Sequence, residues 1–267
     1  ETLVNTVGDG SAVGKQAGII ATGDLSLNAK MDIINLGADV KAGGNASLKA
    51  GGDIKFDTIE KRSTTSTHSY ANTGVLRSEY SSSTTTNVDQ VRSGLSVGGN
   101  LSMKAGNDIT LAGVEGNVGG NASLNAGGNV NLVGRENTTT TNTQTTKSGL
   151  GVGGGVYGTN KVDEDKFSSR NVGTTLDVGG NANVKAGKDV TLQGSNLNAK
   201  GDVNVDATNI NVLAGRDIDT VNRTETTTTF LKSSSGGSSS QATGERLPSR
   251  DWMTSRTVMA AGSRTSS

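Results

Sequence analysis

The sequence contains no cysteine, a single proline and few aromatic residues, and each shortage removes a class of protein. Without cysteine the chain can form neither a disulfide framework nor a thiolate metal site. One proline in 267 residues argues against collagen and against a proline-rich linker. Because only 31% of the residues are hydrophobic and 3% aromatic, we do not expect the compact core of an enzyme-like domain.

Net charge and long apolar runs are also missing. The 25 basic and 25 acidic residues balance, so we expect no positive field that would steer the protein to nucleic acid. No apolar run reaches the length of about 18 residues that spans a bilayer. The first ten residues have neither the basic start nor the apolar core of a signal peptide. We therefore expect a fragment of a longer chain, with any secretion signal upstream.

Glycine is abundant instead, at 39 residues, and much of it occurs in a repeated Gly-Asn or Gly-Asp step. Successive steps are 21, 55, 21, 60 and 21 residues apart. Because 55 is 21 plus 34 and 60 is 21 plus 39, two long insertions interrupt an otherwise constant period. A fixed period of this length is typical of stacked units, none of which can bury its apolar face alone.

Within each unit the apolar residues alternate with polar ones, as at Leu101 and Met103 and again at Ile109 and Leu111. A period of two indicates strands, and strands of about four residues are too short for independent hairpins. They suit a coil whose successive turns pair in parallel, with three short faces in each 21-residue rung. Counting a less regular first rung over residues 2–22, we predict an all-β solenoid, a parallel β-helix of about seven rungs.

Corner residues should recur with the same period. Glycine accepts the positive φ of tight corners, and asparagine and aspartate tolerate it, so we expect these residues between the faces. One such side chain per rung would stack into a turn ladder, with hydrogen bonds running along it. The predicted ladder is Asp24, Asn45, Asn100, Asn121, Asn181 and Asp202.

The two insertions share one phase of the repeat and are rich in serine and threonine. They span about residues 60–94 and 135–174, and a third copy begins at about 221–233. Ser or Thr fills 15 of the 35 positions from 60 to 94. High β propensity with little to bury favours solvated two-stranded extensions that pair on one side of the coil, and disorder is the alternative. We divide the chain into repeats over 1–233 and a flexible tail over 234–267.

Particular motifs resemble a known family. The repeated "GGNLSMKAGNDITLAG" and "GGNASLNAGGNVNLVG", with "SGLSVGG" at 93–99 and "SGLGVGG" at 148–154, are similar to the haemagglutinin repeats of filamentous haemagglutinin-like exoproteins. These include the effectors of contact-dependent growth inhibition in Gram-negative bacteria, and the resemblance covers about residues 1–235. It implies export through a dedicated outer-membrane transporter, by two-partner secretion, and folding outside the cell as a right-handed parallel β-helix.

The resemblance also implies a function. We expect a non-catalytic rod segment of a secreted cell-surface exoprotein that supports toxin delivery across the outer membrane of a target cell. Its partners would be the two-partner transporter and the target-cell outer membrane or a host surface. The alternative is an adhesin that binds host glycans or receptors, and a third reading is a polysaccharide-active enzyme on a β-helix.

We expect no catalytic residue, no cofactor and no metal site. The only histidine, His68, lies in the polar stretch "STTSTHSYANT" without a matching base, so a hydrolase triad lacks its parts. Four aspartates each begin a second strand, and calcium takes about six to eight oxygens, more than one carboxylate per rung supplies. They are read as turn residues: Asp32, Asp53, Asp108 and Asp189.

Some exposed side chains are candidates for binding. Three lysines alternate with apolar pairs, where outward lysines discourage edge aggregation; the alternative is a column that attracts sulfated glycans or lipopolysaccharide phosphate. These are Lys49, Lys104 and Lys185. Three tyrosines lie in the insertions, where an exposed ring could contact a sugar or a partner: Tyr70, Tyr80 and Tyr157.

Overall fold

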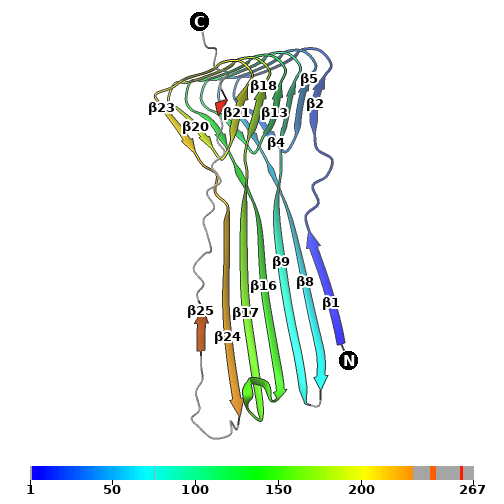
Figure 1. The fold of residues 1–267 in the computed structure, drawn as a ribbon. Helices are drawn as coiled ribbons and strands as arrows, with labels where there is room; N and C mark the ends of the chain where they lie inside the picture. The colour runs from blue at the N-terminus through cyan, green and yellow to red at the C-terminus, as the bar shows by residue number, and fades with distance from the viewer. Residues whose placement is uncertain (1, 75, 231–240, 245–258, 261–267) are drawn as a thin grey trace.

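The computed structural model describes residues 2–74, 76–230, 241–244 and 259–260, and these residues lie almost entirely in strands. The chain has two parts, a coil of short parallel strands and a long antiparallel sheet that hangs from it (Figure 1). The one helical segment in these residues is a 3-10 turn, Val152–Gly154. None of the described residues forms a helix long and apolar enough to cross a membrane.

Three parallel sheets make up the coil, and each turn contributes one short strand to each of them. The first sheet contains β2 (Gly18–Ala21), β5 (Asp39–Ala42), β10 (Gly94–Val97), β13 (Glu115–Val118), β18 (Thr175–Val178), β21 (Asn196–Ala199) and β26 (Met259–Ala260). The second contains β3 (Leu25–Ala29), β6 (Ala46–Ala50), β11 (Leu101–Ala105), β14 (Ala122–Ala126), β19 (Ala182–Ala186) and β22 (Val203–Asp206). The third contains β4 (Ile33–Leu36), β7 (Ile54–Asp57), β12 (Ile109–Ala112), β15 (Val130–Val133), β20 (Asp189–Gln193) and β23 (Asn209–Leu213).

Successive turns pair in register across both insertions. Met103 lies opposite Leu48, which is 55 residues earlier, and opposite Leu124, which is 21 residues later. Val130 lies opposite Val190 across the second insertion. The all-β prediction of repeated parallel strands, stacked at a period that the insertions do not shift, is therefore confirmed.

Alternate side chains fill the interior of the coil. In β6, β11, β14 and β19 every second residue is buried and the residues between them are exposed. The interior is aliphatic, with Phe56 as its largest side chain, and Ile109, Leu111 and Leu132 have no exposed surface. Since burying one such side chain stabilises a fold by about 1.5–3 kcal/mol, columns of them support the coil despite the small aromatic content.

The glycines of the Gly-Gly steps serve close approach rather than positive φ, which corrects the sequence-based expectation. Neither Gly98 nor Gly119 has a positive φ, and a Cβ on Gly119 would lie 2.2 Å from the carbonyl oxygen of Gly98. Successive turns therefore leave no room for a side chain. Positive φ occurs instead at Gly37 (56°), Gly113 (60°) and Gly194 (55°), where the chain passes from the third sheet to the first without a hairpin.

The insertions form the long antiparallel sheet, which we call the extension sheet. Its strands, in spatial order, are β1 (Thr2–Gly10), β8 (Ile59–Gly74), β9 (Arg77–Val91), β16 (Arg135–Leu150), β17 (Tyr157–Val172), β24 (Ile218–Phe230) and β25 (Gln241–Gly244). Hairpins β8–β9 and β16–β17 leave the coil after β7 and β15 and re-enter it at β10 and β18 (Figure 1). At about 3.4 Å per residue, a strand of 16 residues reaches roughly 50 Å.

Two further expectations are settled differently by position. Residues 2–10 pair antiparallel with β8, so most of the stretch expected as a less regular first rung belongs to the extension sheet. The insertions are paired strands rather than disordered loops, as the two-stranded interpretation expected. Of the tail expected to be flexible, 234–240, 245–258 and 261–267 lie outside the described residues. Its described parts are β25 and β26.

Candidate interaction surface

The structure places the six residues of the expected turn ladder in one column on the coil. The backbone N–H of each later residue donates to the side-chain Oδ1 of the residue one turn earlier, at 2.6 to 2.9 Å. Side-chain amides contribute little: Asn45 Nδ2 to Asp24 Oδ1, at 3.3 Å, is the one such bond among the described ladder residues. Positive φ is not used, because Leu76 is the only described residue besides glycine that has it. The column therefore holds turns together.

A second ladder runs beside the first and includes residues that sequence reasoning missed. Asp53, Asp108 and Asp189 each donate a backbone N–H to the side chain one turn earlier, at 2.7 to 3.2 Å. Asn129 and Asn209 complete the column, and their positions at the same phase of the repeat were the available signal. Within the described ranges, no cluster of three histidine, cysteine, aspartate or glutamate side chains could hold a metal ion. These carboxylates act as turn residues.

An ion pair joins the coil to the extension sheet at the neck between them. The guanidinium of Arg135, the first residue of β16, donates from Nε to Asp57 Oδ1 at 2.7 Å and from Nη2 to Oδ2 at 2.6 Å. Lys55 Nζ lies 3.2 Å from the same Oδ2. Burial raises the pKa of the Asp57 carboxyl, but hydrogen bonds from Arg135, the Thr58 N–H and Lys55 outweigh it and leave the pKa below its ordinary value. The ionised pair fixes where the second hairpin leaves the coil.

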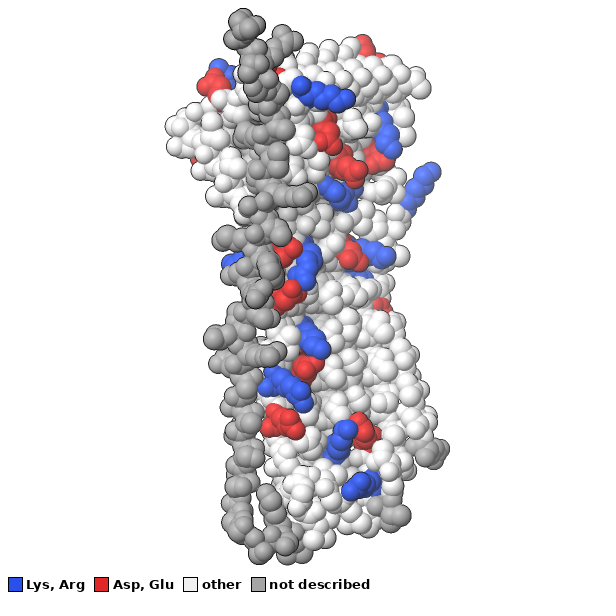
Figure 2. Space-filling model, viewed as in Figure 1, with Lys and Arg blue, Asp and Glu red and all other residues white. Residues whose placement is uncertain are grey.

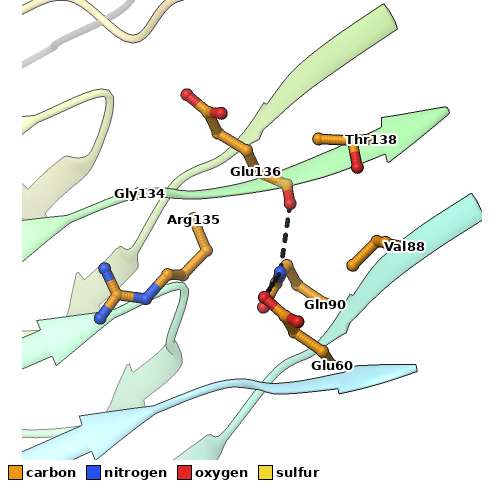
Figure 3. Close-up of a pocket in the computed structure, with 7 residues that line it drawn as sticks. All are labelled: Glu60, Val88, Gln90, Gly134, Arg135, Glu136 and Thr138. Carbon is orange, nitrogen blue, oxygen red and sulfur yellow. Dashed lines mark hydrogen bonds between the residues drawn. The ribbon is translucent and has the colours of Figure 1, made fainter. Parts of the chain in front are cut away.

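A shallow polar hollow lies beside this ion pair (Figure 3). It has a volume of about 500 Å³ and is lined by Glu60, Val88, Gln90, Gly134, Arg135, Glu136 and Thr138. Gln90 Nε2 donates to the carbonyl oxygen of Glu136 at 3.1 Å and to Glu60 Oε1 at 3.4 Å. The Glu136 carboxylate accepts from Ser169 Oγ at 3.0 Å. These groups join three strands of the extension sheet and are engaged with one another.

Hydroxyl groups form rows across both faces of the extension sheet. Successive residues of a strand point to opposite faces, so even and odd positions line different sides. On one face the paired oxygens are Thr64–Thr86 at 3.2 Å and Ser66–Thr84 at 3.0 Å. On the other they are Ser83–Thr143 at 3.3 Å and Thr85–Thr141 at 3.1 Å. The serine and threonine content of the insertions thus becomes two hydroxyl-lined surfaces.

Aromatic side chains lie on one of these faces, near the end away from the coil. Tyr70 lies opposite Tyr80, and the side chains are 45% and 38% exposed. His68 lies on the same face, with Nδ1 3.2 Å from the hydroxyl of Tyr80 and the two rings stacked at 6.5 Å. The histidine thus contacts a phenol, which offers no general base for catalysis.

The third tyrosine continues this surface. Tyr157 lies between Leu150 and Phe230 in the register, and the three side chains are 45%, 37% and 68% exposed. Because Tyr80 lies opposite Thr146, four residues before Leu150 on β16, all of these side chains are on the same face. We call Tyr70, Tyr80, Leu150, Tyr157 and Phe230 the aromatic face.

Charges of both signs are interspersed over the visible surface (Figure 2). The lysines expected to face solvent are exposed on the second coil sheet, where Lys49 lies opposite Lys104. Lys185 is separated from them by Asn125 and pairs with Asp206 at 2.9 Å. The three lysines therefore do not form a continuous basic column.

Comparison with known proteins follows the structural unit. The model of the haemagglutinin repeat matches residues 9–78, 76–164 and 156–246. Each match contains the strands of two coil turns together with the first strand of the following extension. No match is found among curated proteins or solved structures.

Proposed function

We propose, from the premise that this chain belongs to the haemagglutinin-repeat family, that it is a non-catalytic segment of a secreted exoprotein on the surface of a Gram-negative bacterium. In this role the coil is a stiff rod, and the extension sheet is the part that contacts a partner. The segment supports delivery of a toxin across the outer membrane of a target cell, after export through a two-partner transporter.

The repeated unit of two turns and one hairpin is the observation that supports this role. Parallel strands in register make the coil continuous, and the hairpins all leave it between the third and first sheets, so they gather into one extension sheet. Right-handed winding agrees with the rule for parallel strand crossovers. Folding that proceeds by adding one turn to the last needs no cofactor and suits a protein that folds as it emerges from a transporter.

A deletion tests the proposed role in the parent exoprotein. Removing residues 59–91 takes out one hairpin and leaves Thr58, Arg92 and Ser93 between β7 and β10, close to the two residues that join β12 to β13. We expect normal display on the producing cell and loss of toxin entry into target cells. The matched control removes 135–172, the second hairpin, and should act in the same way. Toxin entry that survives both deletions would contradict the role.

The aromatic face supports a second candidate, an adhesin that binds glycans. Half-exposed rings of Tyr70, Tyr80 and Tyr157 can stack on sugar rings, and neighbouring hydroxyl rows can hydrogen-bond to sugar hydroxyls. Under this function, Tyr70→Ala and Tyr80→Ala should lower binding to a glycan array, whereas Val221→Ala on the opposite face should not. A blank array for the unaltered chain would exclude this candidate.

A further inference from the structure

The coil has two open faces that are related to each other as consecutive turns are inside it. At one face β2, β3 and β4 each pair on one side only, and Ile19, at an inward position of β2, is 47% exposed. At the other face β22 and β23 are the terminal strands, and Ile210 and Val212 are 50% and 47% exposed. Both faces expose the aliphatic side chains that an adjacent turn covers elsewhere in the coil.

The hydrogen-bonding groups of the two faces are complementary. Asp24 and Asp32 accept from the next turn, and no described residue accepts a hydrogen bond from their own backbone N–H groups. Asp202 and Asn209 bond to the preceding turn, and among the described residues no donor reaches their remaining side-chain oxygens. Each ladder therefore ends in free N–H donors at one face and free oxygen acceptors at the other.

The extension sheet has matching edges as well. Strands that leave the coil (β8, β16, β24) alternate with strands that return to it (β9, β17), and β1 is also a returning strand (Figure 1). The outer edge of β1 is unpaired over nine residues that include exposed Leu3, Val4 and Val7 and only one charge, Asp9. Long edge strands without lysine or proline readily accept another strand.

We propose that a second copy of this chain binds head to tail, with its β2, β3 and β4 stacked on β21, β22 and β23 and its β1 paired with β24. Such a contact continues the interface between turns that already holds the coil together, and it continues the alternation of the extension sheet. Ile33 of the second copy would cover Ile210, and Leu25 and Leu27 would cover Val203 and Val205, as the register inside the coil dictates.

This contact joins two different surfaces and does not close on itself, so it produces open filaments rather than a defined dimer. At the receiving face, β26 pairs with two residues of β21 and β25 with four residues of β24. The incoming β2 and β1 have four and nine residues and replace these shorter strands.

Sedimentation of the full chain over a range of concentrations tests the proposal. We expect the mean mass to rise with concentration well beyond a dimer. Ile19→Lys blocks one face and Ile210→Lys the other, because an inward lysine on an edge strand opposes stacking. Each variant alone should remain monomeric, whereas an equal mixture should give a heterodimer that grows no further. Ile34→Lys, at a 62% exposed position on the outward side of β4, is the matched control and should assemble normally.

The mixture distinguishes head-to-tail from face-to-face contact, since like faces would still associate in one of the two single variants. A full chain that stays monomeric at every concentration overturns the proposal. Assembly of both single variants at the level of the unaltered chain also overturns it. Far-ultraviolet circular dichroism verifies that each variant retains its strands.

Discussion

Single residues of the coil are constrained chiefly by the turn stacked against them. Gly120 and Gly23 occupy equivalent places in the repeat, but only Gly120 has a turn before it in the chain. A Cβ on Gly120 would lie within contact of the ladder oxygen of Asn100 and 3.0 Å from the Gly99 carbonyl carbon, whereas nothing lies within 4 Å of a Cβ on Gly23. The same sequence step therefore carries a different constraint at each place.

Alanine substitutions measure this difference. We expect Gly120→Ala to lower the free energy of unfolding by about 1–3 kcal/mol, because the backbone must move to admit the methyl group. Gly23→Ala should be neutral or slightly stabilising, since it only restricts the unfolded chain. Urea unfolding of both variants gives the comparison. Equal losses at the two positions would show that close stacking is not the cause.

The ladder side chains allow a second test at this scale. Asn121 accepts the backbone N–H of Asn181 at 2.7 Å, so Asn121→Ala leaves that donor without its protein partner. Because water can reach this exposed corner, we expect a loss of about 0.5–1.5 kcal/mol in the free energy of unfolding. Asn121→Asp keeps the acceptor oxygen and should retain most of the stability at neutral pH. Asn125→Ala, on the exposed side of β14, is the matched control and should have little effect.

Between elements, the neck ion pair connects a hairpin to the coil turn it leaves. Replacing Asp57 by Asn removes the charge that holds Arg135 and Lys55, and we expect a loss of roughly 2 kcal/mol at pH 7. The pKa of Asp57 is lowered in the folded protein. Its stabilising contribution is therefore present above the ordinary carboxyl pKa and disappears as the pH falls through the lowered value.

Unfolding at two pH values checks both parts of this prediction. The difference between the unaltered chain and Asp57→Asn should be full at neutral pH and close to zero at strongly acidic pH. Asp219→Asn removes another two-pronged contact, with Arg170, whose hydrogen bond lowers the pKa of Asp219. That pair lies on the open surface, so its loss should matter much less. A gap between the Asp57 variant and the unaltered chain that persists in acid would refute the ionic origin.

Across the whole molecule, stability should be highest in the coil. The coil buries continuous columns of aliphatic side chains, whereas most residues of the extension sheet are half-buried or exposed. Amide groups exchange with solvent through local opening, which costs least where few apolar contacts are lost.

Hydrogen exchange followed by mass spectrometry tests this gradient. The amides of β11 and β14 in the middle of the coil should exchange slowest, those of β9 and β16 faster, and those of the edge strand β1 fastest. Uniform protection over both parts would mean that the extension sheet unfolds only together with the coil.

The sequence by itself determined the period, the short alternating strands, the phase of the insertions and the turn ladder, because each depends on residues a few positions apart and on a simple count. Only the tertiary structure decided which contacts the insertions make. Asp57 and Arg135 are 78 residues apart, and the aromatic face draws on strands from different hairpins. It also decided that residues 2–10 join the extension sheet and that the Gly-Gly steps serve close stacking. The physical reason is that alternation along a strand is local, whereas the strand or turn that lies beside it is chosen by pairing across the whole chain.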